Sequence, residues 1–250
     1  MKIAIISDIH GNIDALDSVI RDIENEGCEK IFCLGDLVMA GPNPIPTLNK
    51  IQDFMSNKKF HIIQGNTDKM LSVFSFEIYN EIMKVAPVMA SAYLADSKLL
   101  SDEDKKFLAN LPAQEEITIG NIKILLVHGS PRKNNENIYP NMPINEVEEM
   151  IQGTDANIIF CGHTHIPCGY QTNTEQTIVN VGSVGRPFSE EPKATYAIME
   201  IDEECKTFTV KHKFIDYDIE KASNALKERG FEGSEKLAQM LMKATSRYPK

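Results

Sequence analysis

Polar side chains that can bind metal ions follow several apolar segments of this sequence. The segments SDIH, LGD, QGN, VHG and CGHTH together hold two aspartates, one asparagine and four of the six histidines. Oxygen and nitrogen donors of these types suit hard or borderline divalent metals, and the set lacks the thiolates of structural zinc sites. Seven such donors are too many for one ion. The candidate ligands are Asp8, His10, Asp36, Asn66, His128, His163 and His165.

Each of these segments also has an ordinary structural interpretation when it is taken alone. An Asp-x-His sequence after a strand is commonly a capped turn, and Gly-Asp is nearly uninformative. Gly-His-x-His is more specific, because residues i and i+2 of an extended segment point to the same side. All five segments follow apolar runs, and this shared placement favours one common site.

Strands and helices must alternate along the chain to bring these residues together. Residues 2–7 form an apolar run, and residues 12–26 carry apolar side chains at helical spacing. The alternation continues with an expected strand at 30–36, a helix at 44–58 and a strand at 59–66. Strands joined by helices predict a parallel sheet, in which ligands bind at the carboxyl ends of the strands.

The rest of the chain predicts further helices and a second group of strands. Residues 69–111 predict two or three helices, inserted between two ligand motifs where they can form a wall or lid of the site. Residues 116–217 predict mainly short strands, beginning with a hairpin through Gly120-Asn121. Residues 217–250 predict a helical segment. No linker or repeat interrupts the chain, which predicts a single domain over residues 1–250.

Composition and charge narrow the class of protein. The chain has 250 residues with 42% hydrophobic and 25% charged residues, and no apolar run approaches the roughly 18 residues that cross a bilayer. The five cysteines show no Cys-x-x-Cys spacing, which favours a reducing, cytoplasmic location without disulfides. A net charge of −10 argues against binding to duplex nucleic acid, so an anionic substrate has to be attracted locally.

The ordered motifs resemble those of the calcineurin-like metallophosphoesterases. The segments SDIHGNIDAL, GDLVMAGPNP, LVHGSP and NVGSVGRP, followed by ATYAIMEI, are similar to the compact bacterial and archaeal phosphodiesterase branch of that superfamily. The resemblance covers roughly residues 1–215. It implies an α/β fold, a four-layer α/β/β/α sandwich in which two mixed β-sheets pack face to face with helices outside.

The resemblance also implies two divalent metal ions at one edge of the sheets. The ligands implied for one ion are Asp8, His10, Asp36 and His165. Those implied for the other ion are Asp36, Asn66, His128 and His163. Asp36 would bridge the ions, and a water held between them would ionise near neutral pH and attack phosphorus. The catalytic residues implied for this metal-activated water are Asp36, Asn66 and His128. The ligand types leave manganese, iron, nickel and zinc open.

One position departs from the family pattern. Many members carry a histidine after the Gly-Asn that protonates the leaving oxygen, whereas this chain has Thr67, followed by Asp68. A threonine hydroxyl cannot replace a general acid, whose contribution is about 10² to 10⁴ in rate. Its loss matters least for stabilised leaving groups. The sequence therefore favours phosphodiesters or nucleotide phosphoanhydrides as substrates, and we expect Asp68 to accept hydrogen bonds from nearby backbone groups.

Two other functions stay open at this point. A phosphomonoesterase acting on proteins or small molecules has the same metal ligands, and a binding scaffold of the same fold, such as the retromer subunit, is a non-catalytic alternative. The expected partner is a small phosphorylated substrate such as a nucleotide. Arg132 in the loop HGSPRK, with Lys133 beside it, and Arg186 in GSVGRP are candidates for contacts to its phosphate, although basic loop residues are as often solvated. The physiological substrate and the oligomeric state stay open.

Overall fold

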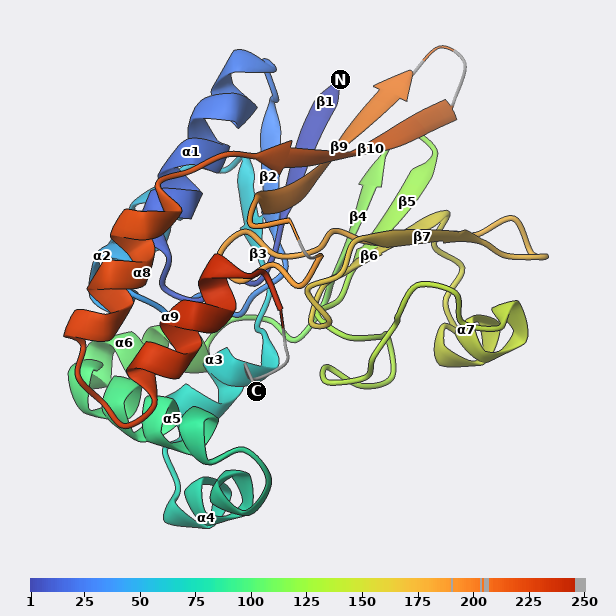
Figure 1. The fold of residues 1–250 in the computed structure, drawn as a ribbon. Helices are drawn as coiled ribbons and strands as arrows, with labels where there is room; N and C mark the ends of the chain where they lie inside the picture. The colour runs from blue at the N-terminus through green and yellow to red at the C-terminus, as the bar shows by residue number, and fades with distance from the viewer. Residues whose placement is uncertain (190, 203, 205–206, 246–250) are drawn as a thin grey trace.

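The two halves of the predicted site lie on two different β-sheets. The structure is a computed structural model that describes residues 1–189, 191–202, 204 and 207–245. The described residues form two five-stranded sheets that pack face to face, with helices on their outer faces (Figure 1). This arrangement is the α/β/β/α sandwich that the resemblance implies.

The first sheet combines three parallel strands with an antiparallel pair. Its strand order is β10 (Thr207–Ile215), β9 (Ala194–Asp202), β1 (Lys2–Ile6), β2 (Lys30–Cys33) and β3 (Phe60–Ile62). The strands β1, β2 and β3 run parallel, and β9 runs antiparallel to β1. The carboxyl ends of the three parallel strands therefore meet at one edge.

The second sheet also has three parallel strands, but it carries one antiparallel strand at each edge. Its strand order is β4 (Glu115–Ile119), β5 (Ile122–Leu126), β6 (Ile158–Cys161), β8 (Thr177–Asn180) and β7 (Cys168–Gln171). The strands β5, β6 and β8 are parallel, whereas β4 and β7 are antiparallel edge strands. The expected hairpin through Gly120-Asn121 is confirmed as the β4–β5 connection.

Apolar side chains fill the space between the sheets and the space under the helices. In β1, Ile3 and Ile5 pack between the sheets against Phe160 and other residues of the second sheet. The alternate residues Ala4 and Ile6 pack under the helices of the outer layer. A strand that is buried on both faces reads as a continuous apolar run, which is why this segment of the sequence lacks a polar alternation.

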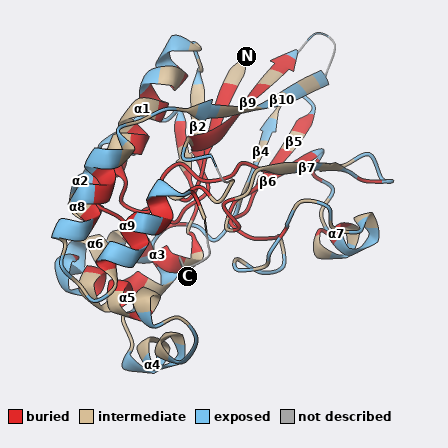
Figure 2. Ribbon diagram, in the orientation of Figure 1, coloured by how far each residue is buried: buried red, intermediate tan, exposed pale blue. Residues whose placement is uncertain are grey.

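Helices cover both outer faces unequally. The first sheet is covered by α1 (Ile13–Asn25), α2 (Pro44–Phe54), α8 (Ile219–Glu228) and α9 (Ser234–Met242). Among the helices of the described residues, α7 (Ile144–Met150) is the one that packs on the outer face of the second sheet. The buried sides of α1, α8 and α9 face the sheet and their exposed sides face solvent (Figure 2).

Helix α2 ends four residues before the expected boundary, because Asn57 Oδ1 accepts a hydrogen bond from Lys59 N in a turn that competes with the helix.

The predicted helical insertion lies after β3. It contains α4 (Phe76–Val85), α5 (Pro87–Leu99) and α6 (Asp102–Ala109), and it follows the short helix α3 (Asn66–Ser72). Three helices in this region agree with the sequence, but α3 begins at Asn66, inside the expected strand 59–66. Among the described residues we find no helix whose length and apolar character would carry it across a bilayer.

Candidate metal centre

The seven candidate ligands all follow parallel strands of the two sheets. Asp8 and His10 follow β1, Asp36 follows β2, and Asn66 is the first residue of the helix after β3. The other three, His128, His163 and His165, follow β5 and β6. Backbone hydrogen bonds tie these loops together, including Asp8 N to Gly35 O at 3.0 Å and Gly162 N to His128 O at 2.9 Å. One edge of the sandwich therefore gathers residues that are far apart in sequence.

Backbone strain is concentrated at this edge. Five of the seven candidates have left-handed backbone conformations, with φ between 47° and 66°: Asp8, His10, Asp36, His163 and His165. Each such non-glycine residue costs about 1–3 kcal/mol, and this strain persists only where the surroundings fix the conformation. Clustering of strained residues is typical of functional sites.

Two glycines allow the loops to approach closely. A Cβ atom on Gly65 would lie 2.1 Å from Asp36 Oδ1, and one on Gly162 would lie 2.4 Å from Asp8 Oδ2. Neither glycine has a positive φ, so close approach and not a special backbone angle makes a side chain impossible there.

Asp8, His10 and His165 form the first compact group of donor atoms. His165 Nε2 lies 3.2 Å from Asp8 Oδ1, and His10 Nε2 lies 3.8 Å from the same oxygen. The Nδ1–H of His10 donates to Met39 O at 2.9 Å, and that of His165 donates to Arg186 O at 2.7 Å. With the proton on Nδ1, each Nε2 carries its lone pair toward the site.

Asp36 and His128 form the second group, close to Asn66. His128 Nε2 lies 3.4 Å from Asp36 Oδ2 and 3.0 Å from Asn66 Oδ1, and His128 Nδ1–H donates to Leu34 O at 2.7 Å. Asp8 Oδ1 is also 3.9 Å from His128 Nε2, so Asp8 lies between the two groups. The ring of His163 lies 5.3 Å from that of His128 and is more open to solvent.

Buried nitrogen and oxygen atoms whose lone pairs lack a hydrogen-bond donor show that a cation fits here. His10 Nε2 and His165 Nε2 face each other at 3.1 Å, although both carry lone pairs when their Nδ1 atoms are protonated. Asp8 Oδ1 is fully buried and has no hydrogen-bond partner among the described residues. Two lone pairs and a bare carboxylate oxygen repel one another unless a positive charge lies between them.

The buried charges of the metal-free centre favour the charged forms of His128 and Asp36, so they shift the two pKa values in opposite directions. Burial opposes protonation of His128, but Asp36 and Asp8 overcome it and raise the pKa of His128 to about 10. Burial likewise opposes ionisation of Asp36, but His128 and His10 lower the pKa of that carboxyl to about 2. In the metal-free protein, the proton on His128 therefore supplies part of the positive charge that a metal ion would bring.

Known proteins are similar to this chain in sequence and in fold. A family model described as the calcineurin-like phosphoesterase superfamily domain matches residues 1–204. The chain belongs to this superfamily. Uncharacterized protein MJ0912 of Methanocaldococcus jannaschii is 33% identical over 237 residues, which cover 88% of this chain and 89% of that protein. Membership makes the chain a metal-dependent hydrolase, and it confirms the family that the motifs indicate.

Two solved structures share the fold of this calcineurin-like phosphoesterase. A metallophosphoesterase from Sphaerobacter thermophilus has a TM-score of 0.75 at 27% identity and covers 98% of this chain and 100% of its own. Hypothetical protein PH1004 from Pyrococcus horikoshii OT3 has a TM-score of 0.83 at 23% identity and covers 96% of this chain and 97% of its own. The sandwich is therefore shared over nearly the whole chain.

Asp68 holds the Asp36 loop of the phosphoesterase in place. Its Oδ2 accepts hydrogen bonds from Asp36 N at 2.7 Å and Gly65 N at 2.9 Å, and its Oδ1 accepts one from Leu37 N at 2.9 Å. Burial and the charge of Asp36 raise the pKa of Asp68 to about 6. The expectation that Asp68 binds neighbouring backbone groups is confirmed.

A buried ion pair supports the other side of the same loop. Arg229 Nη2 lies 2.7 Å from Asp96 Oδ1, and Asp96 Oδ2 accepts a bond from Ala40 N at 2.8 Å. Arg229 Nη1 donates to Gly41 O at 2.8 Å. This pair fixes the segment whose Met39 carbonyl orients His10. The sequence does not predict this pair, because neither residue lies in a recognisable motif.

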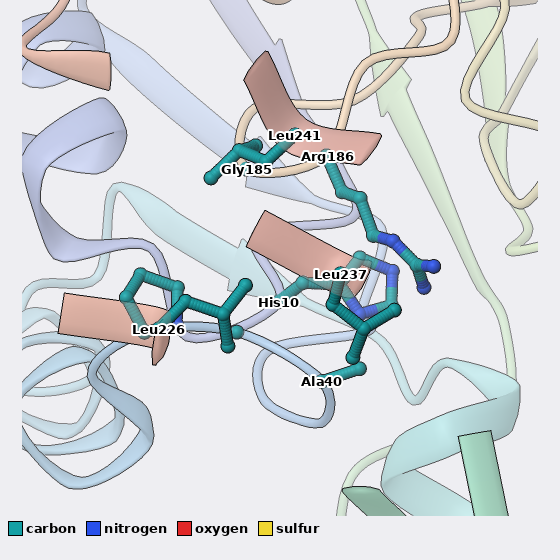
Figure 3. Close-up of a pocket in the computed structure, with 9 residues that line it drawn as sticks. His10, Ala40, Gly185, Arg186, Leu226, Leu237 and Leu241 are labelled. Carbon is teal, nitrogen blue, oxygen red and sulfur yellow. The ribbon is translucent and has the colours of Figure 1, made fainter. Parts of the chain in front are cut away.

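The C-terminal helices close the space beside His10. Leu226 of α8 and Leu237 and Leu241 of α9 lie around a cavity of about 10 Å³ that is also lined by His10 and Arg186 (Figure 3). A space of that size holds at most about one water molecule. The apolar side chains therefore keep bulk water away from this side of the centre.

The two arginines suggested by the sequence occupy different surroundings. Arg186 lies beside His165, with its guanidinium 5.5 Å from the Phe188 ring and Nη1 3.4 Å from Met89 Sδ. Arg132 instead pairs with Glu136 at 2.8 Å and with Glu149 at 3.4 Å. Only Arg186 borders the first group of donor atoms.

Proposed function

We propose that this calcineurin-like phosphoesterase holds two divalent metal ions and hydrolyses phosphodiesters or nucleotide phosphoanhydrides. The observation that carries the proposal is the pairing of a full set of seven oxygen and nitrogen donors with a threonine at the position after Asn66. The donors allow activation of water, but the chain offers no imidazole at residue 67 to protonate a leaving group.

The protein's own residues divide the work between binding and positioning. Asp8, His10 and His165 would hold one cation, Asp36 would bridge, and Asn66, His128 and His163 would hold the other. Divalent cations bound in this way act as Lewis acids toward phosphoryl oxygens and lower the pKa of water. The Nδ1–H bonds of His10, His128 and His165 to carbonyl groups keep their Nε2 atoms aimed at the site.

The absence of a general acid at Thr67 limits the leaving group. The Thr67 hydroxyl points to Val38 O at 3.4 Å, and its backbone N–H donates to Asp36 Oδ1 at 2.8 Å. Neither contact delivers a proton. Phosphate, phenolate and similar anions leave without protonation, whereas an alkoxide does not.

A panel of substrates tests this proposal. The full chain is reconstituted with Mn²⁺, Ni²⁺ or Zn²⁺ and assayed on bis(p-nitrophenyl) phosphate, diadenosine tetraphosphate and an alkyl phosphate monoester. We expect hydrolysis of the first two and slow turnover of the third. Asp36→Asn is expected to lower kcat/KM by about 100-fold or more, because it removes the bridging charge.

Four outcomes would overturn the proposal. Hydrolysis of neither diester nor anhydride with any of the metals contradicts it, as does full activity of Asp36→Asn. Preferred hydrolysis of the alkyl monoester would instead indicate a phosphomonoesterase. Less than one equivalent of metal after reconstitution would indicate a binding scaffold.

A further inference from the structure

A cavity beside the second group of donor atoms is unusually basic for this chain. It has a volume of about 420 Å³ and is lined by His128 together with Lys69, Arg132 and Lys133. None of the described residues that line it is acidic, although the whole chain has 36 acidic and 26 basic residues. The local charge of this cavity is therefore opposite to the charge of the molecule.

The two lysines are the cationic groups that remain available there. Arg132 is neutralised by Glu136, whose carboxylate accepts bonds from both Nε and Nη2 of the arginine. Among the residues that the structure describes, Lys69 and Lys133 form no ion pair, and both are exposed. Glu136 also lowers the net positive charge around Lys133. The positive charge of Lys69 on α3 is therefore less compensated by a carboxylate than that of Lys133.

The position of the cavity connects it to the metal centre. Lys69 lies one helical turn after Asn66, and Lys133 follows His128 in the loop after β5. Of the seven candidate ligands, His128 is the one that lines this cavity. A substrate that has one phosphate at the centre and the next one in this cavity would meet these lysines there.

The lining also suggests which part of a substrate binds there. Gln114 and Asn134 add amide groups, and Ala113 and Pro131 are the small apolar contributions. Phe, Tyr and Trp are absent from the described residues that line the cavity, so it offers no large aromatic surface for stacking of a nucleobase. Lysine ammonium groups bind phosphate oxygens as point charges without regard to a base.

We propose that this cavity is an anion subsite that binds the neighbouring phosphate groups of a polyphosphorylated substrate through Lys69 and Lys133. This inference rests on the proposed function and sharpens it, because it favours phosphoanhydrides over diesters with a single phosphorus. The base of a nucleotide substrate would be a minor determinant.

The test compares one substrate that reaches the subsite with one that does not. The double variant Lys69→Met/Lys133→Met is assayed with Mn²⁺ on tripolyphosphate and on bis(p-nitrophenyl) phosphate. We expect kcat/KM to fall about 30-fold for tripolyphosphate, mainly through KM, and to change by less than about threefold for the diester. The double variant Lys58→Met/Lys98→Met removes the same charge from exposed positions elsewhere and is expected to leave both values unchanged.

Direct binding gives a second readout that does not need turnover. Isothermal titration of tripolyphosphate into metal-free protein is expected to show binding that is at least about tenfold weaker in the Lys69→Met/Lys133→Met variant. Equal binding by both proteins would overturn the subsite, as would an equal loss of activity on both substrates.

Failure of the subsite and failure of the proposed function can be told apart. If the unmodified protein hydrolyses the diester but neither binds nor hydrolyses tripolyphosphate, only the subsite is wrong. If it hydrolyses neither substrate with any metal, the proposed function is wrong.

Discussion

The Thr67 side chain takes no essential part in the geometry of the centre. Its hydroxyl makes one long contact, 3.4 Å to Val38 O, while its backbone N–H bonds Asp36 Oδ1. Thr67→Val keeps the shape and the backbone bond. We therefore expect kcat/KM on bis(p-nitrophenyl) phosphate to change by less than about threefold, whereas removal of a general acid would lower it by about 10² to 10⁴. Steady-state assays with Mn²⁺ measure this, and a loss of 100-fold would show that the hydroxyl handles a proton.

The raised pKa of His128 predicts how metal binding depends on pH. The metal-free ring has a pKa of about 10, above its ordinary value of 6.5, and a metal ion needs the neutral ring. Below about pH 10 the ring is protonated and binding must release its proton, so the apparent affinity for Mn²⁺ is expected to rise with pH by up to about tenfold per unit. Calorimetry in buffers of different ionisation enthalpy measures the released proton.

The same shift affects the stability of the metal-free protein in the opposite direction. Because the folded pKa of His128 is raised, its contribution is fully present below pH 6.5 and is lost as the pH rises toward 10. The control for the prediction on metal binding is His61→Gln, which alters a histidine paired with Glu115 outside the centre. This variant should keep the same pH dependence of Mn²⁺ affinity as the unmodified protein. A Mn²⁺ affinity of the unmodified protein that does not change between pH 7 and pH 9 would contradict the prediction on metal binding.

At the scale of secondary-structure elements, α5 and the C-terminus of α8 hold the loop after β2 through Asp96 and Arg229. The Asp96 side chain is 0% exposed and that of Arg229 is 9% exposed. Arg229→Met leaves a buried carboxylate without its partner, so we expect a loss of about 3–5 kcal/mol in the free energy of unfolding. Urea unfolding of the metal-free protein measures this loss.

An exposed ion pair provides the matched comparison for Arg229→Met. Lys84 and Glu81 of α4 have side chains that are 65% and 67% exposed, and Lys84→Met is expected to cost less than about 1 kcal/mol. Adding Asp96→Asn to Arg229→Met should recover part of the loss, because no buried charge is then left unpaired. Equal losses for Arg229→Met and Lys84→Met would show that the buried pair does not support the loop.

The elements could be predicted from the sequence where a local pattern determines them. The ligand loops follow continuous apolar runs such as KIAII, and the hairpin at Gly120-Asn121 has a turn signal between two strands. By contrast, the support of Met39 by Asp96 and Arg229 depends on how α5 and α8 pack against one loop. Such contacts between distant segments leave no periodic pattern, so they cannot be predicted from the sequence.

At the scale of the whole molecule, the candidate ligands join the two sheets at one edge. Asp8, Asp36 and Asn66 come from the first sheet, and His128, His163 and His165 come from the second. A metal ion that binds only the folded arrangement stabilises it by about 2.7 kcal/mol at 100 times its dissociation constant. We therefore expect chelation of the metal to lower Tm in scanning calorimetry. Asp36→Asn should reduce the difference between loaded and chelated protein, and an unchanged Tm on chelation would contradict a centre shared by both sheets.

The position of β1 in the middle of the first sheet has a consequence for the newly made chain. Its neighbours are β2 on one side and β9, which begins at Ala194, on the other. A nascent chain that has already emerged through His165 contains every candidate ligand, yet the second edge of β1 is still unpaired and Arg229 has not been synthesised. A fragment of residues 1–190 should therefore bind Mn²⁺ far more weakly than the full chain in equilibrium dialysis, and full-chain affinity would disprove this. Loading of the metal is thus expected to come after synthesis, when the last strands and helices have closed around the first.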